Sequence, residues 1–540
     1  MPVIESTVDL RSASFAANRA QMLELIQRFR SLEQQVRESS ARQAERFHAR
    51  GQLLPRERVE RLLDRGTPFL ELSTLAGYKM HDDDGGKNIM GGGNVVGVGQ
   101  VAGRQVLVTA NDSAIKGGSI SPMGLRKSLR GQAIALQNRL PCVNLIESGG
   151  ANLLYQSELF VEGGRAFCNM ARLSAAGIPQ ITVCHGSSTA GGAYLPGLSD
   201  YVVVVRGKSK IFLAGPPLVK AAIGEDATDE ELGGAEMHMS VTGTAEYMAD
   251  DDAGAIEIAR ELLAKLPWDE GAGAPRPGPG FCPPRHDTEE LLGIVPVDYR
   301  QPYDVRQVIA RIVDDSDFLE FKPLYGAETV CGHARIEGQA CGVLGNNGPI
   351  YPSGACKAAH FIQACCQSGT PLIYLQNITG YMVGREAEAQ GIVKHGSKMI
   401  QAVSNATVPQ LTVIIGASFG AGNYGMCGRS YDPRFIFSWP NSQIAVMGGE
   451  QAARVMEIIT RAKFERQGVQ MDPAALKQMS QGLRDKLDRQ STAMYATARI
   501  WDDGIIDPRD TRRVLAHALR VCLEGERRAP RRTSFGVGRM

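Results

Sequence analysis

The sequence predicts an α/β protein made of two tandem domains related by internal duplication. Residues 177–194 return as residues 407–424, and residues 140–145 return as residues 370–375, always 230 positions later. The matching positions include Pro141 and Pro371, Pro179 and Pro409, Gly186 and Gly416, and Tyr194 and Tyr424. In the first copy short strands such as 143–146 and 181–183 alternate with helical stretches such as 123–136, which is typical of βαβ units. Because solenoid repeats are far shorter than this period, each copy is predicted to be a whole domain.

The regions outside the repeat follow from local composition. Residues 15–65 are predicted to be helical, with Met22, Ile26 and Phe29 at helical spacing, as a packing or oligomer helix. The Gly-rich string 91–101 indicates a turn followed by strands more strongly than a phosphate-binding loop. The Pro- and Gly-rich stretch 267–284 is predicted to be the linker, which divides the chain into domains 1–285 and 286–540. The basic tail is predicted to be solvated and poorly ordered, and carries Arg527, Arg528, Arg531, Arg532 and Arg539.

Composition excludes several classes of protein. Lys and Arg total 59 against 58 Asp and Glu, so charge alone gives no reason to expect binding to nucleic acid or to a membrane surface. Eleven scattered cysteines without a CxxC pair argue against a disulfide framework or a thiolate zinc site, and no metal is expected. The N-terminus lacks a signal-peptide core and no apolar run reaches membrane-spanning length, which predicts a soluble cytoplasmic protein.

Each copy contains a small-residue turn directly after an apolar strand. The first holds Gly191 and Gly192, and the second holds Ala421 and Gly422. A helix that begins at such a turn leaves backbone N–H groups unpaired, and two adjacent N–H groups can form an oxyanion hole in which each donor lowers a barrier by about 3 kcal/mol. Tight strand–helix packing is the alternative explanation, but recurrence at the same place in both copies favours a functional turn.

Other catalytic patterns are absent or ambiguous. The first turn has no Gly-x-Ser-x-Gly nucleophile elbow and the chain has no HExxH, which weakens acyl-enzyme and zinc-hydrolase interpretations. Glu147 and Glu158 could act as acid or base near the first turn, although solvated or capping roles are at least equally compatible with the sequence.

Five motifs, two of which contain the turns, identify a family. They are Ser148–Asn152, Thr189–Tyr194, Phe212–Lys220, Gly345–Gly348 and Gly420–Arg429. Together they resemble the carboxyltransferase (beta) subunit of biotin-dependent acyl-CoA carboxylases, in the 3-methylcrotonyl-CoA and geranyl-CoA branch, and most of all the geranyl-CoA carboxylase beta subunit. The similarity extends from about residue 20 to about residue 525.

The resemblance implies a fold and a mechanism. The fold is two crotonase-like (ClpP/crotonase) superdomains, with the active site between the N-domain of one subunit and the C-domain of its dimer partner. Carboxybiotin arrives on a partner protein, and because biotin itself can remove the substrate proton, no side-chain base is required. The family places the thioester at Gly191 and Gly192 and the biotin ureido oxygen at Ala421 and Gly422.

The resemblance also assigns binding residues. The acyl-CoA side comprises Gly117, Gly118, Ser119, Ile120, Ser148, Gly149, Gly150, Ala151, Gly163, Gly164 and Ala190. The biotin side comprises Gly420, Asn423, Tyr424, Asn347 and Gly380. The chain has neither an ATP-grasp domain nor the usual biotinylation motif, so a separate alpha subunit with biotin carboxylase and biotin carrier domains is implied, around a core of six beta subunits in an alpha6beta6 complex.

Two departures from the methylcrotonyl-type pattern suggest the substrate. Those relatives carry an aromatic pair where this chain has Ile120 and Ser121, and a longer aromatic-containing segment where this chain has 156–167 with Gly163 and Gly164. Smaller side chains in the wall of the pocket leave room for a longer apolar acyl chain. Each additional CH₂ buried there would contribute about 0.8 kcal/mol to binding. The first choice is therefore carboxylation of geranyl-CoA at its γ-carbon, a ligase reaction of terpene catabolism.

Other functions remain open on the sequence alone. The second choice is 3-methylcrotonyl-CoA, in leucine catabolism, followed by propionyl-CoA or acetyl-CoA. More distant alternatives are a crotonase-type hydratase or isomerase, which needs a carboxylate beside one oxyanion hole, and a non-catalytic scaffold for a biotin-bearing partner. The duplicated turn argues against the first, because one hole suffices there, and the intact Gly pairs argue against the second.

Overall fold

The computed structural model describes residues 2–267, 280–467, 473–528 and 537. The chain forms two compact units. The N-unit contains the described residues from 30 to 276, with 498–500 and those from 521 onward, and the C-unit contains the described residues up to 29, from 277 to 497 and from 501 to 520. Most of the predicted linker, and the tail residues Arg531, Arg532 and Arg539, lie outside the described residues.

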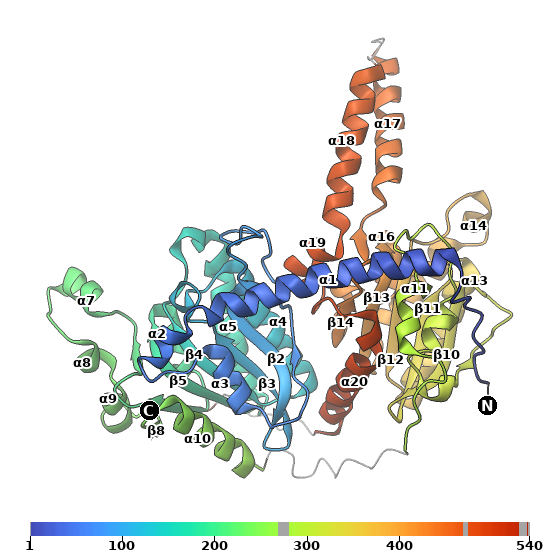
Figure 1. The fold of residues 1–540 in the computed structure, drawn as a ribbon. Helices are drawn as coiled ribbons and strands as arrows, with labels where there is room; N and C mark the ends of the chain where they lie inside the picture. The colour runs from blue at the N-terminus through green and yellow to red at the C-terminus, as the bar shows by residue number, and fades with distance from the viewer. Residues whose placement is uncertain (1, 268–279, 468–472, 529–536, 538–540) are drawn as a thin grey trace. The chain divides into compact units, whose positions relative to one another are not determined.

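An eight-stranded sheet forms the centre of the N-unit (Figure 1). Its order is β1-β2-β3-β4-β5-β6-β8, with β7 paired to the end of β5. The first three strands are antiparallel, and β3 through β8 are parallel. The strands are β1 (Leu70–Glu71), β2 (Asn94–Val101), β3 (Arg104–Asn111), β4 (Cys142–Ser148), β5 (Gln180–Thr189), β6 (Tyr201–Val205), β7 (Lys210–Phe212) and β8 (Tyr247–Ala249).

Helices cover both faces of this sheet. Side chains along a strand alternate between the two faces, and here both sets are apolar and buried. Val106 and Val108 of β3 pack with α3 and α10, whereas Leu107 faces Gly131 of α4, which in turn packs against α5. The helices whose residues lie in this part of the chain are α2 (Ala44–His48), α3 (Pro55–Leu62), α4 (Pro122–Asn138), α5 (Gln156–Ala175), α6 (Tyr194–Gly197), α7 (Pro216–Ile223), α8 (Asp229–Gly233), α9 (Ala235–Ser240) and α10 (Asp252–Lys265).

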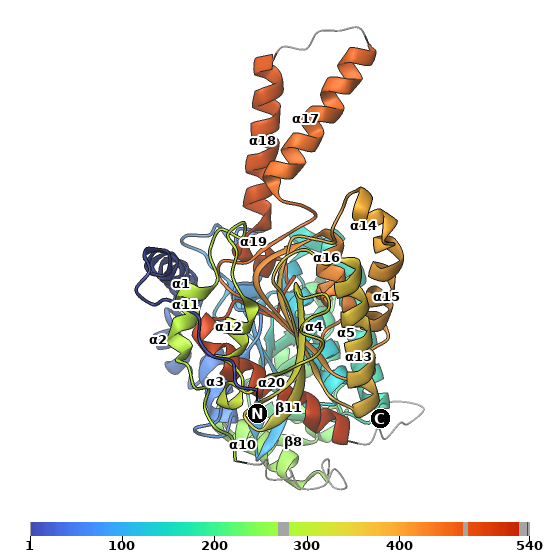
Figure 2. The same ribbon diagram turned by 90° about the vertical axis from the view of Figure 1, so that its right-hand side faces the viewer.

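The C-unit repeats this plan with seven strands in the order β14-β13-β12-β11-β10-β9, with β15 paired to the end of β13. Its strands are β9 (Leu319–Glu320), β10 (Thr329–Ile336), β11 (Gln339–Asn346), β12 (Leu372–Ile378), β13 (Gln410–Phe419), β14 (Phe435–Ser438) and β15 (Gln443–Ala445). Its helices are α11 (Leu291–Ile294), α12 (Val305–Ile309), α13 (Pro352–Ser368), α14 (Arg385–Ala389), α15 (Ile392–Ser404), α16 (Gly420–Gly425), α17 (Gly449–Arg466) and α18 (Pro473–Ser491). Helices α17 and α18 project from the C-unit as a long antiparallel hairpin (Figure 2).

The duplication extends to strand register. Cys142 pairs with Gln180 in the N-unit and Leu372 with Gln410 in the C-unit, which keeps the offset of 230 residues on both strands. Each pair of strands also contains an irregularity at the same place, at Glu147 in β4 and at Asn377 in β12. The predicted two-domain α/β duplication is therefore confirmed.

Two predictions about the chain ends need correction. The single helix expected over 15–65 is broken into α1 (Ala13–Ala41), α2 and α3, because Gly51 adopts a left-handed conformation at φ 63° and Pro55 starts a new helix. Near the C-terminus, α19 (Ala493–Ala498) and α20 (Thr511–Arg527) are helical. Arg527 ends α20 and Arg528 is buried, donating to the Arg139 carbonyl at 3.2 Å, so the basic tail begins later than expected.

In the part of the chain that the structure describes, no helix is long and apolar enough to cross a membrane. The eleven cysteines are all free thiols. Among the described residues, no three His, Cys, Asp or Glu side chains are grouped so that they could bind a metal ion.

Candidate functional site

The first Gly-rich turn, here the N-turn, follows β5 and forms the 3₁₀ turn Ala190–Ala193. Ala190 takes a left-handed conformation with φ 51°, which is unusual for a residue with a side chain. This bend redirects the chain from strand to helix, so that Gly191 and Gly192 lie in the first turn. The start of a helix is where backbone N–H groups can point outward toward a ligand.

The second turn, here the C-turn, has the same construction. Gly420 follows β13 with φ 52°, and Ala421 and Gly422 lie in the first turn of α16. Glycine adopts this left-handed conformation without steric cost, whereas Ala190 at the matching position of the first copy adopts it at a cost, as residues at functional sites often do. The N-turn and the C-turn each present two adjacent N–H groups at the end of a buried strand.

The space behind the two turns differs. A Cβ atom added to Gly192 would lie 3.4 Å from the Ser148 hydroxyl oxygen, an ordinary contact. A Cβ atom added to Gly422 would lie 2.8 Å from Ile378 Cγ1 and 3.0 Å from Gly380 Cα, and Gly380 is backbone that cannot rotate away. The C-turn therefore requires glycine at 422 for packing, whereas the N-turn has room at 192.

Two loops flank the N-turn and are locked to each other. The Ile120 N–H donates to the Gly150 carbonyl at 2.9 Å, and the Asn152 N–H donates to the Ile120 carbonyl at 3.1 Å. Gly118, with φ 72°, approaches so closely that an added Cβ would lie 2.2 Å from the Glu147 carbonyl oxygen. The loop carrying Gly117–Ile120 and the loop carrying Ser148–Asn152 thus form one backbone assembly beside Gly192.

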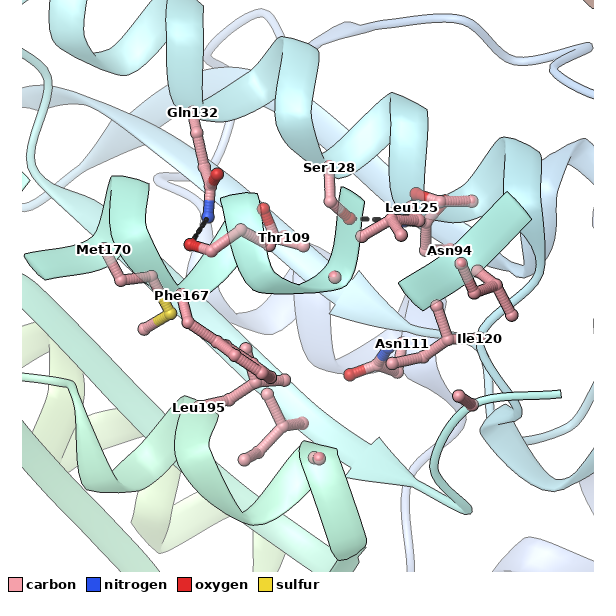
Figure 3. A pocket seen from close by; sticks show the side chains of 18 of the residues that line it. Asn94, Thr109, Asn111, Ile120, Leu125, Ser128, Gln132, Phe167, Met170 and Leu195 are labelled. Atoms are coloured by element: carbon pink, nitrogen blue, oxygen red, sulfur yellow. Dashed lines mark hydrogen bonds between the residues drawn. The ribbon is translucent and has the colours of Figure 1, made fainter. Parts of the chain in front are cut away.

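A cavity of about 630 Å³ opens beside the N-turn, within the size range of ligand pockets. It lies among β3, β4, β5, α4 and α5 (Figure 3). Its lining residues include Thr109, Asn111, Ile120, Leu125, Ser128, Gln132, Ile146, Ala151, Leu159, Phe160, Gly163, Gly164, Phe167, Met170, Gly191, Gly192 and Leu195. None of the described residues that line it is Asp, Glu, Lys, Arg or His.

Most polar side chains of the wall are already hydrogen-bonded to the protein. The Asn94 amide donates to the Ser128 hydroxyl at 2.9 Å, and the Gln132 amide donates to the Ala166 carbonyl at 3.1 Å (Figure 3). Phe167 and Met170 add apolar surface from α5. The cavity is therefore suited to an uncharged, largely hydrocarbon group.

Gly163 and Gly164 lie on the α5 wall of the cavity. A Cβ atom at either position would have no other atom within 4 Å. Glycine costs helix stability relative to alanine, by about 1 kcal/mol in a helix interior. The two glycines thus leave volume free in the cavity that larger residues could fill.

The structure groups most of the residues predicted for the acyl-CoA side. Those that line the cavity are Ser119, Ile120, Ala151, Gly163, Gly164, Gly191 and Gly192. Gly118, Ser148 and Gly150 lie directly behind the N-turn, and Ala190 is its first residue. An added Cβ on Gly149 would lie 3.2 Å from the Gly117 carbonyl. Their roles remain predictions.

The residues predicted for biotin belong to the C-unit, and two of their side chains are already hydrogen-bonded to neighbouring residues. Asn347 lines a second cavity of about 450 Å³ with Tyr299 and Phe419, yet its side chain accepts from the Val305 N–H at 2.7 Å and donates to Asp304 at 2.9 Å. The Asn423 amide donates to the Ser418 hydroxyl at 2.7 Å. Tyr424 stacks on Tyr431 and is 44% exposed. Of these side chains, that of Tyr424 projects furthest into solvent.

The two carboxylates considered as acids or bases are both engaged elsewhere. Glu147 accepts from Arg58 at 2.8 Å and from the Ser113 hydroxyl at 2.9 Å, and Glu158 lies 3.0 Å from His81. Neither lines the cavity in the described chain. No local pattern in the sequence predicts the Arg58 contact, because Arg58 and Glu147 are 89 residues apart in the chain.

Comparison with known proteins agrees with this geometry. The carboxyl transferase domain matches residues 46–535. The crystal structure of the geranyl-CoA carboxylase beta subunit of P. aeruginosa is 57% identical, with a TM-score of 0.93 and full coverage of both chains.

The chain belongs to the carboxyl transferase family. A probable methylcrotonoyl-CoA carboxylase beta chain of Drosophila melanogaster is 47% identical over all of this chain and 95% of the relative. A probable biotin-dependent acyl-coenzyme A carboxylase beta2 subunit of Mycobacterium tuberculosis is 50% identical over 92% of both. The protein is thus a biotin-dependent acyl-CoA carboxyltransferase, and its two duplicated domains have the predicted crotonase-like fold.

The different packing behind the two turns of this carboxyltransferase predicts different tolerance to a methyl group. Gly422→Ala should lower the rate of acyl-CoA carboxylation at least about tenfold, because it forces the C-turn away from Gly380. Gly192→Ala should keep the rate within about threefold, since its Cβ meets only ordinary contacts. Steady-state rates of the two variants check this, and equal losses would contradict it.

Proposed function

We propose that this carboxyltransferase transfers a carboxyl group from carboxybiotin to the γ-carbon of geranyl-CoA. The observation that carries the proposal is the uncharged cavity beside the N-turn, widened by Gly163 and Gly164. A branched ten-carbon chain offers only apolar surface to such a wall. The 57% identity to a geranyl-CoA carboxylase beta subunit supports the same choice.

In this proposal the N-turn acts on the thioester. The N–H groups of Gly191 and Gly192 donate to the thioester oxygen, whose negative charge grows as the γ-proton leaves. Preorganised donors of this kind stabilise the transition state by about 3 kcal/mol each. Because the lining residues include no charged side chain, the cavity itself supplies no base, and this disfavours a hydratase or isomerase that depends on a carboxylate.

The C-turn acts on the second reactant. Carboxybiotin, when bound, supplies the carboxyl group and an acceptor for the substrate proton. The N–H groups of Ala421 and Gly422 donate to the ureido oxygen, with Gly420, Asn423, Tyr424, Asn347 and Gly380 nearby. The small residues of this turn fit the role, because they let a ligand approach the backbone closely.

We infer that the complete enzyme needs other chains. A separate alpha subunit would carry biotin and its carboxylase, around a hexamer of this chain within an alpha6beta6 complex. Each active site would combine the N-terminal domain (1–285) of one copy with the C-terminal domain (286–540) of another. The partition of the chain into two compact units, each with one turn, supports this arrangement.

A second candidate substrate is 3-methylcrotonyl-CoA. Relatives named methylcrotonoyl-CoA carboxylase beta chain are 45% to 47% identical over the whole of this chain. The shorter group would fit the same cavity with apolar volume left unfilled, and each unburied CH₂ forgoes about 0.8 kcal/mol. Geranyl-CoA is therefore the preferred substrate.

The direct test is reconstitution. The purified chain alone should not carboxylate any acyl-CoA from bicarbonate and ATP, and activity should appear when the biotinylated alpha subunit is added. A panel of geranyl-CoA, 3-methylcrotonyl-CoA, propionyl-CoA and acetyl-CoA, followed by incorporation of labelled bicarbonate, should give the highest kcat/KM with geranyl-CoA. Carboxylation by the single chain would refute the division of roles.

Bulk restored on the α5 wall should change the substrate preference. Gly163→Phe or Gly164→Phe should lower the kcat/KM ratio of geranyl-CoA to 3-methylcrotonyl-CoA by at least about tenfold, roughly 1.4 kcal/mol, because a ring fills the space of several methylenes. Gly164→Ala is the matched control, since it adds no ring and should leave the ratio within about threefold. An unchanged ratio in both Phe variants would reject the wall as the determinant of chain length.

A further inference from the structure

A buried cluster of charges lies directly behind the N-turn. Arg58 of α3 is 1% exposed, and it donates to Glu147 at 2.8 Å and to Asp252 at 3.0 Å. Asp252 also lies 3.1 Å from the His185 ring and accepts from the Leu53 N–H at 2.8 Å. All these residues belong to the N-unit.

Glu147 connects this cluster to the site. It occupies the irregularity of β4, and its carboxylate fills the place where a Cβ on Gly186 of β5 would lie, at 2.8 Å. Its carbonyl packs on Gly118. The next residue, Ser148, accepts from the Gly150 N–H at 3.1 Å and packs against Gly192. Any displacement of Glu147 would therefore move both loops that flank the N-turn.

Arg58 is the one cation among the described residues of this cluster, and it is shared by the two carboxylates Glu147 and Asp252. Burial, together with the charge of Arg58, lowers the pKa of His185 to about 4, so the imidazole is neutral at pH 7. Without Arg58, two carboxylates would remain behind a site where a further negative charge must form. Like charges in a poorly solvated region repel strongly, and the desolvation of a lone carboxylate adds to that cost.

In the C-unit a neutral side chain occupies the position that corresponds to Glu147. Asn377 occupies the irregularity of β12, and its side-chain oxygen accepts from the Ala417 N–H at 2.9 Å. Gly416 again leaves the space for it, since an added Cβ would lie 2.5 Å from that oxygen. A neutral side chain is thus sufficient to hold the irregularity, and the ion pair is a feature of the N-unit.

We propose that Arg58 is a positioning residue for the acyl-CoA reaction: it holds Glu147 behind the N-turn and neutralises it, so that the thioester oxyanion forms beside no uncompensated carboxylate. The inference rests on the proposed function of the N-turn and names a residue that does not contact the substrate. Glu147 in this account is not a base, and its charge is dispensable once Arg58 is absent.

The test compares kcat and KM of reconstituted holoenzymes with geranyl-CoA and 3-methylcrotonyl-CoA. Arg58→Met should lower kcat at least about tenfold and change KM less than about threefold, because the oxyanion exists only in the transition state. The double variant Arg58→Met, Glu147→Gln should recover most of the lost kcat. Glu147→Gln alone, in which Asp252 balances Arg58, should stay within about threefold of wild type.

Arg56→Met is the matched control. Arg56 lies on the same helix, and its ion pair with Glu71 at 2.8 Å joins the edge strand β1 rather than β4. This variant should lower the unfolding temperature without lowering kcat by more than about twofold. Equal kcat losses in Arg58→Met and Arg56→Met, or no recovery in the double variant, would overturn the inference.

Glu147→Gln keeps the test decisive if Arg58→Met does not assemble. A loss in that variant of more than about a hundredfold would show that Glu147 works as an acid or base, and would overturn the inference directly. A wild-type holoenzyme inactive on every acyl-CoA would instead refute the proposed function, so the two failures can be told apart.

Discussion

The constraint on which the structure depends is that each buried strand must turn sharply into a helix start, where backbone N–H groups can point outward. A helix start provides such groups, but only if the chain bends sharply out of the sheet. Ala190 and Gly420 make that bend with φ near 50° in both copies, and small residues follow at once. The sheet, the register shift between each turn-bearing strand and its neighbour, and the helices behind the sheet hold these turns in place.

The same backbone turn has different surroundings in the two copies. The N-turn opens on an apolar cavity and is backed by an ion pair, whereas the C-turn is packed tightly on Gly380 and backed by a neutral amide. The two copies share the turn and the register of the strands before it, but the side chains packed around the turn differ. These different surroundings fit the proposed function, in which one turn receives the oxygen of a thioester enolate and the other the ureido oxygen of biotin.

The sequence predicted the elements that depend on local or repeated signals. The offset of 230 residues revealed the duplication, and the Gly pairs revealed the turns, because both are visible within a few residues. The break of the first long helix was also visible in principle, at Gly51 and Pro55, but helical spacing outweighed it. The Arg58 cluster could not be predicted, since it joins side chains up to 194 positions apart that meet only after the sheet has formed. The same holds for the engagement of Asn347 and Asn423 with their neighbours.

The central claim is that the N-turn serves the acyl-CoA and the C-turn serves biotin. The most direct measurement compares Gly191→Pro with Ala421→Pro, since proline removes one N–H donor from each turn. Each holoenzyme is assayed for acyl-CoA carboxylation and, without acyl-CoA, for loss of the carboxyl group from carboxybiotin, followed as uncoupled ATP hydrolysis. Gly191→Pro should abolish only the first activity and Ala421→Pro should abolish both. Identical behaviour of the two variants in both assays would contradict the division of labour.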